Sequence, residues 1–239
     1  MLLSLLITTA LAGPCDDHPE ILNVGSAMYA SWLVRGDEPV LVDTWNPKHE
    51  EKILDHVLKA GVDPAKISAI VLTHGHADHV GSATALRATL GAPILVGVDD
   101  ADVVAGGVNP PLTPTGPAGR FLQNLVKPEF PAFTPNVLVT DRLDMSIYGI
   151  VGELRVVGGH TPGSMVLTLP GGAAIVGDLV RSKLPGPRKT PALHYFHDDL
   201  PAAHAALRQL LDEGFTCFYV GHGGPLEASA LRTFLNTQP

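Results

Sequence analysis

The strongest constraint on this chain is a dense group of metal-binding side chains directly after an apolar run. Residues 67–72, Ile-Ser-Ala-Ile-Val-Leu, are almost continuously apolar, as expected for a strand buried on both faces. The run ends in the sequence THGHADH, which supplies His74, His76, Asp78 and His79. Side chains two residues apart in extended backbone point the same way, so His74 and His76 can hold one ion as a pair.

The end of this motif predicts ligands for a second ion. If a helix begins at Asp78 or His79, the chain turns there and carries these two side chains toward a point beside the first pair. One short segment then supplies ligands to two adjacent metals. Imidazole and carboxylate groups suit zinc first, and the same set accepts iron, manganese or nickel.

Three later positions provide the further ligands that two ions need. His160 lies in GGHTPGS, Asp178 in IVGD and His222 in VGHG. Each follows an apolar stretch that predicts a strand. Each also has neighbouring glycine, which lets backbone and solvent come close to a bound ion.

Apolar periodicity around these positions predicts sheets covered by helices. A hairpin is expected from residues 30–34 and 39–43. Further strands are predicted at 67–72, 93–97, 153–157, 164–169, 173–176 and 215–220, and helices at 48–60, 80–90, from 198–201 to Gly214, and at the end of the chain. No boundary divides the pattern, so residues 13–239 are predicted to form one domain.

The ordered motifs HxHxDH, GHTPGS, GD and GH resemble the metallo-β-lactamase superfamily over roughly residues 25–235. The resemblance implies an α/β (α+β) fold, a four-layer αββα sandwich with metals at one edge of the sheets. It implies two zinc ions as cofactors, with iron or manganese as alternatives. It also divides the ligands: His74, His76 and His160 on the first ion, Asp78, His79 and His222 on the second, and Asp178 bridging them.

The chemistry that this resemblance implies is hydrolysis without a protein nucleophile. Two adjacent ions lower the pKa of a shared water from about 15.7 toward neutrality and polarise a carbonyl or phosphoryl oxygen. Asp78 is the candidate catalytic residue, because it would orient this water or pass its proton to the leaving group. The expected substrate is a small ester, thioester, lactone or related molecule.

Individual branches of the superfamily differ from this chain in ways that narrow the range of expected substrates. Zinc β-lactamases usually carry Cys or Ser at the place of Asp178, which disfavours antibiotic cleavage. Glyoxalase II-like thioesterases carry an extra helical region, whereas only a short tail follows His222. Lactonases that open acyl-homoserine lactones commonly show Tyr where this chain has Arg181, although Tyr195 is near in sequence.

Two other classes of function stay open as alternatives. Persulfide dioxygenases of this fold use one iron held by two His and one Asp, which His74, His160 and Asp178 match. A β-lactamase is the second enzymatic alternative. A metal-binding protein without catalysis is disfavoured, because such members usually lose ligands first.

Charge argues against a nucleic-acid partner. The chain has 24 acidic and 16 basic residues and a net charge of −8, whereas nucleic-acid binding depends on clustered Lys and Arg. One basic stretch, Arg181 to Lys189, is either a solvated loop or a binding site for an anionic substrate group. A small-molecule partner is therefore expected, and the oligomeric state stays open.

Residues 1–12, MLLSLLITTALA, predict a signal peptide, because a short apolar run ends in a small-x-small pattern. Periplasmic or secreted localisation follows. The alternative is a misplaced start or a buried first strand. The run is shorter than the roughly 20 apolar residues of a membrane-spanning helix, so no stable membrane insertion is expected. Cys15 and Cys217 permit at most one disulfide, and nothing in the sequence tells whether they meet.

The identity of the substrate is expected to depend chiefly on two long loops, 104–136 and 181–197. Residues 106–135 are rich in Pro, Gly and Asn, with a helical turn expected at 121–126, and are either a flexible cover of the site or a plain surface excursion. His194 and His197 are candidates for contacting the substrate or the ligands. His49, His56 and His204 are expected at the surface or half-buried on helices.

Overall fold

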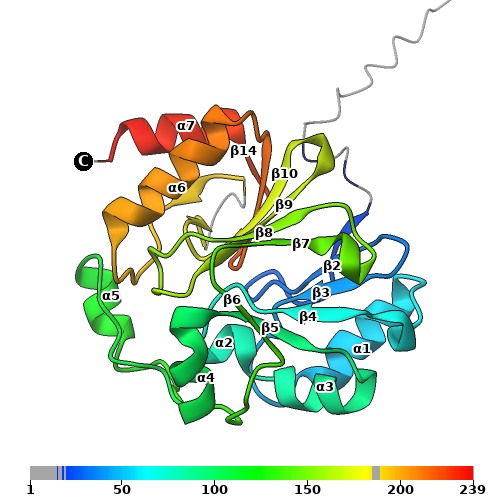
Figure 1. The fold of residues 1–239 in the computed structure, drawn as a ribbon. Helices are drawn as coiled ribbons and strands as arrows, with labels where there is room; N and C mark the ends of the chain where they lie inside the picture. Colours follow the sequence, from blue (N-terminus) through cyan, green and yellow to red (C-terminus); the bar gives the residue numbers. More distant parts are fainter. Residues whose placement is uncertain (1–14, 16–17, 19, 185–188, 239) are drawn as a thin grey trace, which may run out of the picture.

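Two six-stranded sheets pack face to face, and helices cover both outer faces (Figure 1). The computed structural model describes residues 15, 18, 20–184 and 189–238. The predicted signal peptide, residues 1–12, lies outside the described residues. The four-layer αββα sandwich expected from the sequence is confirmed.

The first sheet runs in chain order, from β1 to β6. Its strands are β1 (Ile21–Asn23), β2 (Trp32–Val34), β3 (Val40–Val42), β4 (Ala69–Val71), β5 (Ile94–Gly97) and β6 (Val137–Val139). β1, β2 and β3 pair antiparallel, which includes the predicted hairpin, and β3 to β6 pair parallel. The crossovers carry α1 (Glu50–Lys59), α2 (Ala77–Val80), α3 (Ala83–Leu90), α4 (Ala101–Gly106) and α5 (Pro117–Leu122).

The second sheet has the order β14-β13-β10-β9-β8-β7. Its strands are β7 (Arg142–Asp144), β8 (Glu153–Val156), β9 (Met165–Leu169), β10 (Ala173–Gly177), β13 (Cys217–Val220) and β14 (Leu226–Glu227). β10 and β13 are parallel and are joined through α6 (Leu200–Asp212). α6 and α7 (Ala228–Asn236) lie together over this sheet (Figure 1). β11 (Arg181–Ser182) and β12 (Pro191–Ala192) form a separate small ladder.

The central strands of each sheet are buried on both faces, which explains why β2 to β5, β9, β10 and β13 are apolar runs. In β3, Val40 and Val42 pack between the sheets, whereas Leu41 packs toward α1 and α3. In β10, Ile175 faces the other sheet and Ala174 faces α6. This division follows the two-residue period of a strand. Among the helices of the described chain, none is long and apolar enough to cross a membrane.

The structure corrects some of the predicted helix boundaries. The helix predicted at 80–90 is α3, which begins later, at Ala83, and a separate short helix, α2, ends at Val80; the regular helical backbone is interrupted at Ser82. The turn predicted at 121–126 is α5, which begins earlier, at Pro117. His204 is buried against Phe234, not at the surface or half-buried as expected. The sequence pattern missed the short strands β1, β6, β7 and β14, since two or three residues form a strand only when a partner strand is present.

The two cysteines meet in a disulfide. The Cys15 and Cys217 sulfurs are 2.11 Å apart, and the bond closes a separation of 202 residues. It ties the segment before β1 to the beginning of β13, which answers the question that the sequence left open.

Candidate metal centre

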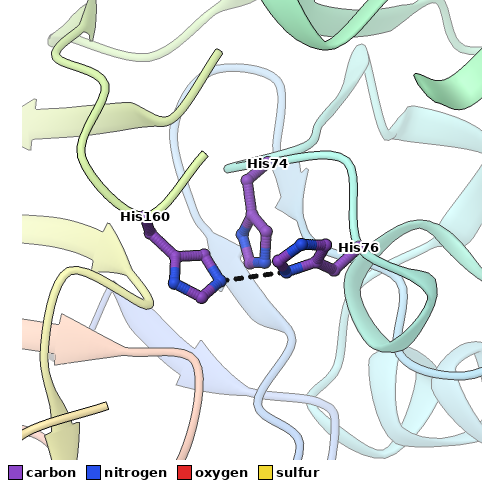
Figure 2. Close-up of side chains that lie close together, drawn as sticks. All are labelled: His74, His76 and His160. Carbon is purple, nitrogen blue, oxygen red and sulfur yellow. Dashed lines mark hydrogen bonds between the residues drawn. The ribbon is translucent and has the colours of Figure 1, made fainter. Parts of the chain in front are cut away.

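The loop after β4 separates the ligands of the HxHxDH motif into two pairs, as predicted. β4 ends at Val71, and α2 begins at Ala77 with His76 in extended backbone immediately before it. His74 and His76 turn toward His160, which lies in the loop between β8 and β9 (Figure 2). The His76 Nδ1 and His160 Nε2 atoms are 3.0 Å apart, and the His74 and His160 ring centroids are 4.5 Å apart.

Asp178 lies between the two pairs. It follows β10, next to the parallel strand β13, whose end carries His222. The Asp178 Oδ2 atom is 3.3 Å from His79 Nε2 and 3.1 Å from His222 Nε2. The same oxygen is 4.0 Å from His74 Nε2 and 3.8 Å from His160 Nε2. The carboxylate therefore faces both sides of the cluster.

The structure brings together all seven side chains that the sequence singled out. They form overlapping groups whose ligand atoms lie within 4.8 Å of one another: His74, His76 and His160; His74, His79 and Asp178; and Asp78, His79 and His222. Asp78 reaches the third group through its Oδ2 atom, 3.4 Å from His222 Nε2.

The buried polar atoms at the centre of this cluster fit a divalent cation. Within the part of the chain that the structure describes, His74 Nε2, His79 Nε2 and Asp178 Oδ1 are buried without a hydrogen-bond partner. Leaving a buried polar group unpaired costs about 1–3 kcal/mol, more when it is charged. Imidazole and carboxylate donors converging in this way are those that zinc and related ions bind.

Burial dominates the electrostatics around His74, His76 and His160. It holds the pKa of His74 and of His160 well below the usual range, with neighbouring histidines adding to the effect. It lowers the pKa of His76 to about 4. These three imidazoles are therefore neutral at neutral pH, which is the form that binds a metal.

Carboxylates dominate the electrostatics on the other side. Burial by itself would lower the pKa of His79, but Asp178, Asp43 and Asp78 outweigh it and raise that pKa well above the usual range. The pKa of His222 is also raised, because Asp178 outweighs burial there. Burial would raise the pKa of Asp178, but the surrounding histidines, first His222, hold it well below the usual range.

Asp43, which the sequence analysis did not single out, orients His79. It stands just after β3, and its Oδ2 atom is 2.9 Å from His79 Nδ1. Its Oδ1 accepts a hydrogen bond of 2.8 Å from the backbone N–H of Thr73. A carboxylate on the far nitrogen of a ligating imidazole sets its tautomer and direction. The signal for Asp43 was present: it ends a buried strand next to the strand that leads to the motif.

Asp100 is the second residue that the sequence analysis missed, and it ties together two ligand loops. Its buried carboxylate accepts from the Gly75 N–H at 2.7 Å, the Thr161 hydroxyl at 2.7 Å and the Gly163 N–H at 2.9 Å. Gly75 lies between His74 and His76, and Thr161 follows His160. Burial raises the pKa of Asp100 despite these hydrogen bonds. No local pattern marks this residue in the sequence.

The family model of the metallo-beta-lactamase superfamily matches residues 26–222. The chain belongs to the metallo-beta-lactamase superfamily. The His/Asp cluster is where this superfamily member can bind metal.

Individual relatives match over shorter segments. Metallo-beta-lactamase domain-containing protein 1 of Homo sapiens is 33% identical over 94 residues, which are 39% of this chain and 34% of that protein. The anaerobic nitric oxide reductase flavorubredoxin of Aeromonas salmonicida is 35% identical over 79 residues, which are 33% of this chain and 15% of that protein. These matches span about a third or less of the length of each curated relative.

Solved metallo-beta-lactamases share the fold over most of their length. The subclass B3 enzyme BJP-1 of Bradyrhizobium japonicum superposes with a TM-score of 0.66 at 20% identity, covering 91% of this chain and 87% of that one. GOB-18 of Elizabethkingia meningoseptica gives a TM-score of 0.65 at 18% identity, covering 91% and 86%. At these identities the likeness shows the fold alone.

A cavity of about 620 Å³ opens over the centre of this superfamily member. Asp78, Asp178 and His222 are among the residues that line it. Apolar side chains also line it, among them Leu112, Leu122, Val126, Leu184 and Phe196. Three of these come from loop 104–136, which therefore covers the site. Arg181, from the basic stretch, also lines the cavity, with its guanidinium 4.1 Å from the centre of the Tyr195 ring.

Of the two histidines predicted near the site, only His194 reaches the ligands. Its Nε2 atom is 3.1 Å from Asp178 Oδ2, and it forms a fourth group with His160 and Asp178. His197 packs with its ring centroid 5.3 Å from that of His160 and belongs to none of the metal-binding groups of the described residues. His49 and His56 are half-buried on or beside α1, as expected.

Proposed function

We propose that this chain is a dinuclear zinc hydrolase that cleaves a small ester, thioester, lactone or related substrate. The observation that carries the proposal is the convergence of seven ligand-type side chains, Asp178 among them, of which four line one cavity. Bound there, two zinc ions would supply a deprotonated water and polarise the substrate's reacting oxygen. The protein then needs no nucleophile of its own.

The proposed division of ligands follows the groups in the cluster. His74, His76 and His160 would hold the first ion, Asp78, His79 and His222 would hold the second, and Asp178 would serve both. Support comes from the position of Asp178 Oδ2, within 4.0 Å of His74 Nε2 on one side and 3.1 Å of His222 Nε2 on the other. Asp43 and Asp100 hold the ligands in place before any ion arrives.

Asp78 is proposed to handle the proton of the reaction. Its side chain is 27% exposed, whereas that of Asp178 is 2% exposed, and it lines the cavity where substrate would lie. A carboxylate there can orient the attacking water or deliver its proton to the leaving group. General acid–base assistance contributes about 10²–10⁴-fold, so Asp78→Ala should lose that much turnover. Unchanged turnover with full metal occupancy would remove this role.

The cavity supports a substrate with an apolar portion. Leu112, Leu122 and Val126 line the same cavity as the candidate ligands Asp78, Asp178 and His222. Each buried CH₂ contributes about 0.8 kcal/mol. A series of chromogenic esters of increasing acyl length should therefore show KM falling with chain length until the cavity is filled. A flat series would exclude binding against these apolar side chains.

Elemental analysis of the purified protein beside a substrate panel tests the proposed reaction. The panel contains esters, thioesters, lactones, a cephalosporin and a phosphodiester. Close to two zinc ions per chain with cleavage of one class is the expected result, and that class names the bond. One iron ion per chain with oxygen consumption and no cleavage would replace the hydrolase with an oxidoreductase of the persulfide dioxygenase kind.

We also propose that the protein works in the periplasm or outside the cell. The apolar residues 1–12 support export, and the Cys15–Cys217 disulfide suits an oxidising compartment. A fusion of residues 1–30 to a reporter tests this directly. A reporter that stays in the cytoplasm would contradict it.

A further inference from the structure

His194 comes to the metal centre from a part of the chain that the seven-residue motif does not include. It follows β12, which ends at Ala192, and its side chain is 7% exposed beside Asp178. Its Nε2 atom is 3.1 Å from Asp178 Oδ2, the same distance as His222 Nε2. With His160 and Asp178 it forms a group whose ligand atoms lie within 4.8 Å of one another.

A single backbone carbonyl orients both His194 and His160. The Phe196 carbonyl oxygen is 2.9 Å from His160 Nδ1 and 3.1 Å from His194 Nδ1. When each Nδ1–H donates to this oxygen, each Nε2 is left unprotonated, 3.1 Å from Asp178 Oδ2 in His194 and 3.8 Å from it in His160. Ligating histidines usually donate their other ring N–H in this way. The competing contact, from the Phe196 N–H to His194 Nδ1, is longer, at 3.3 Å.

The neighbouring rings hold His194 in this direction. Its ring meets His160 edge to face, with 4.6 Å between centroids, and stacks on His222 at 5.5 Å with 19° between the planes. Both neighbours are proposed ligands, one on each side of Asp178. His194 therefore occupies a fixed place inside the cluster and does not need to move to reach an ion.

We propose that His194 is an eighth ligand of the metal centre and joins His160 and Asp178 on the first ion. The inference rests on the proposed dinuclear function and extends its ligand set. In practice the first ion is then held by imidazoles from three separate loops, after β4, after β8 and after β12.

Proton NMR of the cobalt(II)-loaded full-length protein tests this without a substitution. In water, each ligating imidazole gives one strongly shifted, exchangeable N–H signal. We expect six such signals, from His74, His76, His79, His160, His194 and His222. Five signals would overturn the proposal, since the seven-residue set contains only five histidines.

A matched pair of variants adds an affinity measurement. His194→Ala should remove one shifted signal and lower the cobalt affinity of one of the two sites by more than about 100-fold. Loss of a residue that only hydrogen-bonds to a ligand lowers metal affinity by less than this. His197→Ala is the control, because His197 lies in the same segment and beside the same His160 ring. It should keep both cobalt affinities. Added imidazole should restore the missing signal in His194→Ala.

The outcomes separate this inference from the proposed function. His194→Ala with both cobalt ions bound as tightly as before, but with slower turnover, would make His194 a substrate contact and overturn its role as a ligand. Six shifted signals without cleavage of any panel substrate would keep the ligand and remove the hydrolase. Failure of the unaltered protein to bind cobalt would remove both.

Discussion

The two halves of the metal centre differ in how they meet solvent and charge. In the half formed by His74, His76 and His160, every side chain is buried, and burial lowers the pKa values. In the half formed by Asp78, His79 and His222, two side chains are partly exposed, and carboxylates raise the pKa values of the histidines. Burial therefore disfavours protonated histidines in the first half, whereas the carboxylates favour them in the second.

The halves also differ in how the surrounding protein supports them. Asp100 supports the first half through backbone, because it accepts from Gly75 and Gly163 and so fixes the loops that carry the ligands. Asp43 supports the second half through a side chain, because it contacts the His79 ring itself. Substitution of Asp100 should therefore impair both folding and metal binding, whereas substitution of Asp43 should impair mainly metal binding.

Removing the side chain of Asp178, which lies between the two halves, should have the largest effect on metal content and turnover. Asp178→Ala takes a ligand from both ions and leaves His79 and His222 without their nearest carboxylate. We expect loss of both ions and a fall in turnover of more than about 100-fold, beyond that for an outer partner. Metal content at fixed free zinc and hydrolysis rates measure it. Asp212→Ala, at an exposed ion pair with Arg232, is the control. Retention of both ions would show that the halves are independent.

Asp43→Ala should weaken zinc binding in the second half but not in the first. Without its carboxylate partner, His79 loses its fixed direction, and zinc affinity in the second half should fall by roughly 10–100-fold. A stepwise zinc titration with a competing chelator resolves the two affinities. Equal weakening of both sites would contradict the separate support that the structure indicates.

Asp100→Asn should affect stability as well as the first half. The amide keeps the shape of the side chain but turns an N–H₂ toward one of the donors Gly75, Gly163 and Thr161. Hydrogen bonds to a charged group contribute about 1.5–3 kcal/mol each, so unfolding free energy should fall by about 2 kcal/mol or more. Urea unfolding of the metal-free protein measures this. Unchanged stability would mean that the two loops hold their positions without Asp100.

Acid should release the second ion before the first. The raised pKa values of His79 and His222 keep protons on these ligands to higher pH, so protons compete with metal there as pH falls. The pKa of His76 is about 4, and those of His74 and His160 are also lowered, so competition at the first half begins at lower pH. Affinity should fall by about tenfold per pH unit for each proton displaced. Zinc occupancy across a pH series checks the order, and simultaneous release would refute it.

Breaking the disulfide should have the smallest effect on either half. The Cys15–Cys217 bond lies at the beginning of β13, and the ligand His222 follows the other end of that strand. Cys15→Ser should lower unfolding free energy by about 2–5 kcal/mol, because the open chain gains freedom when unfolded. Metal content and turnover at a temperature well below unfolding should not change. A lost second ion would show that this bond also positions His222.

Most of the candidate ligands in the two halves could be predicted from the sequence, whereas one supporting residue could not. The ligands His74, His76, Asp78 and His79 were recognisable because they are adjacent in the chain and follow an apolar run. His160, Asp178 and His222 were recognisable because glycines and strand ends mark each of them. Asp100 carries no such mark, since its partners lie 25 to 63 residues away and become its neighbours only when the loops pack.

The sequence by itself determined the candidate ligand types and the main strands, because apolar periodicity and local motifs act over a few residues. Only the tertiary structure decided that Asp43 and Asp100 support different halves, and that His194 lies beside Asp178 and His160. It also decided that Cys15 meets Cys217. These are contacts between distant segments, and their distances follow from how the two sheets pack against each other.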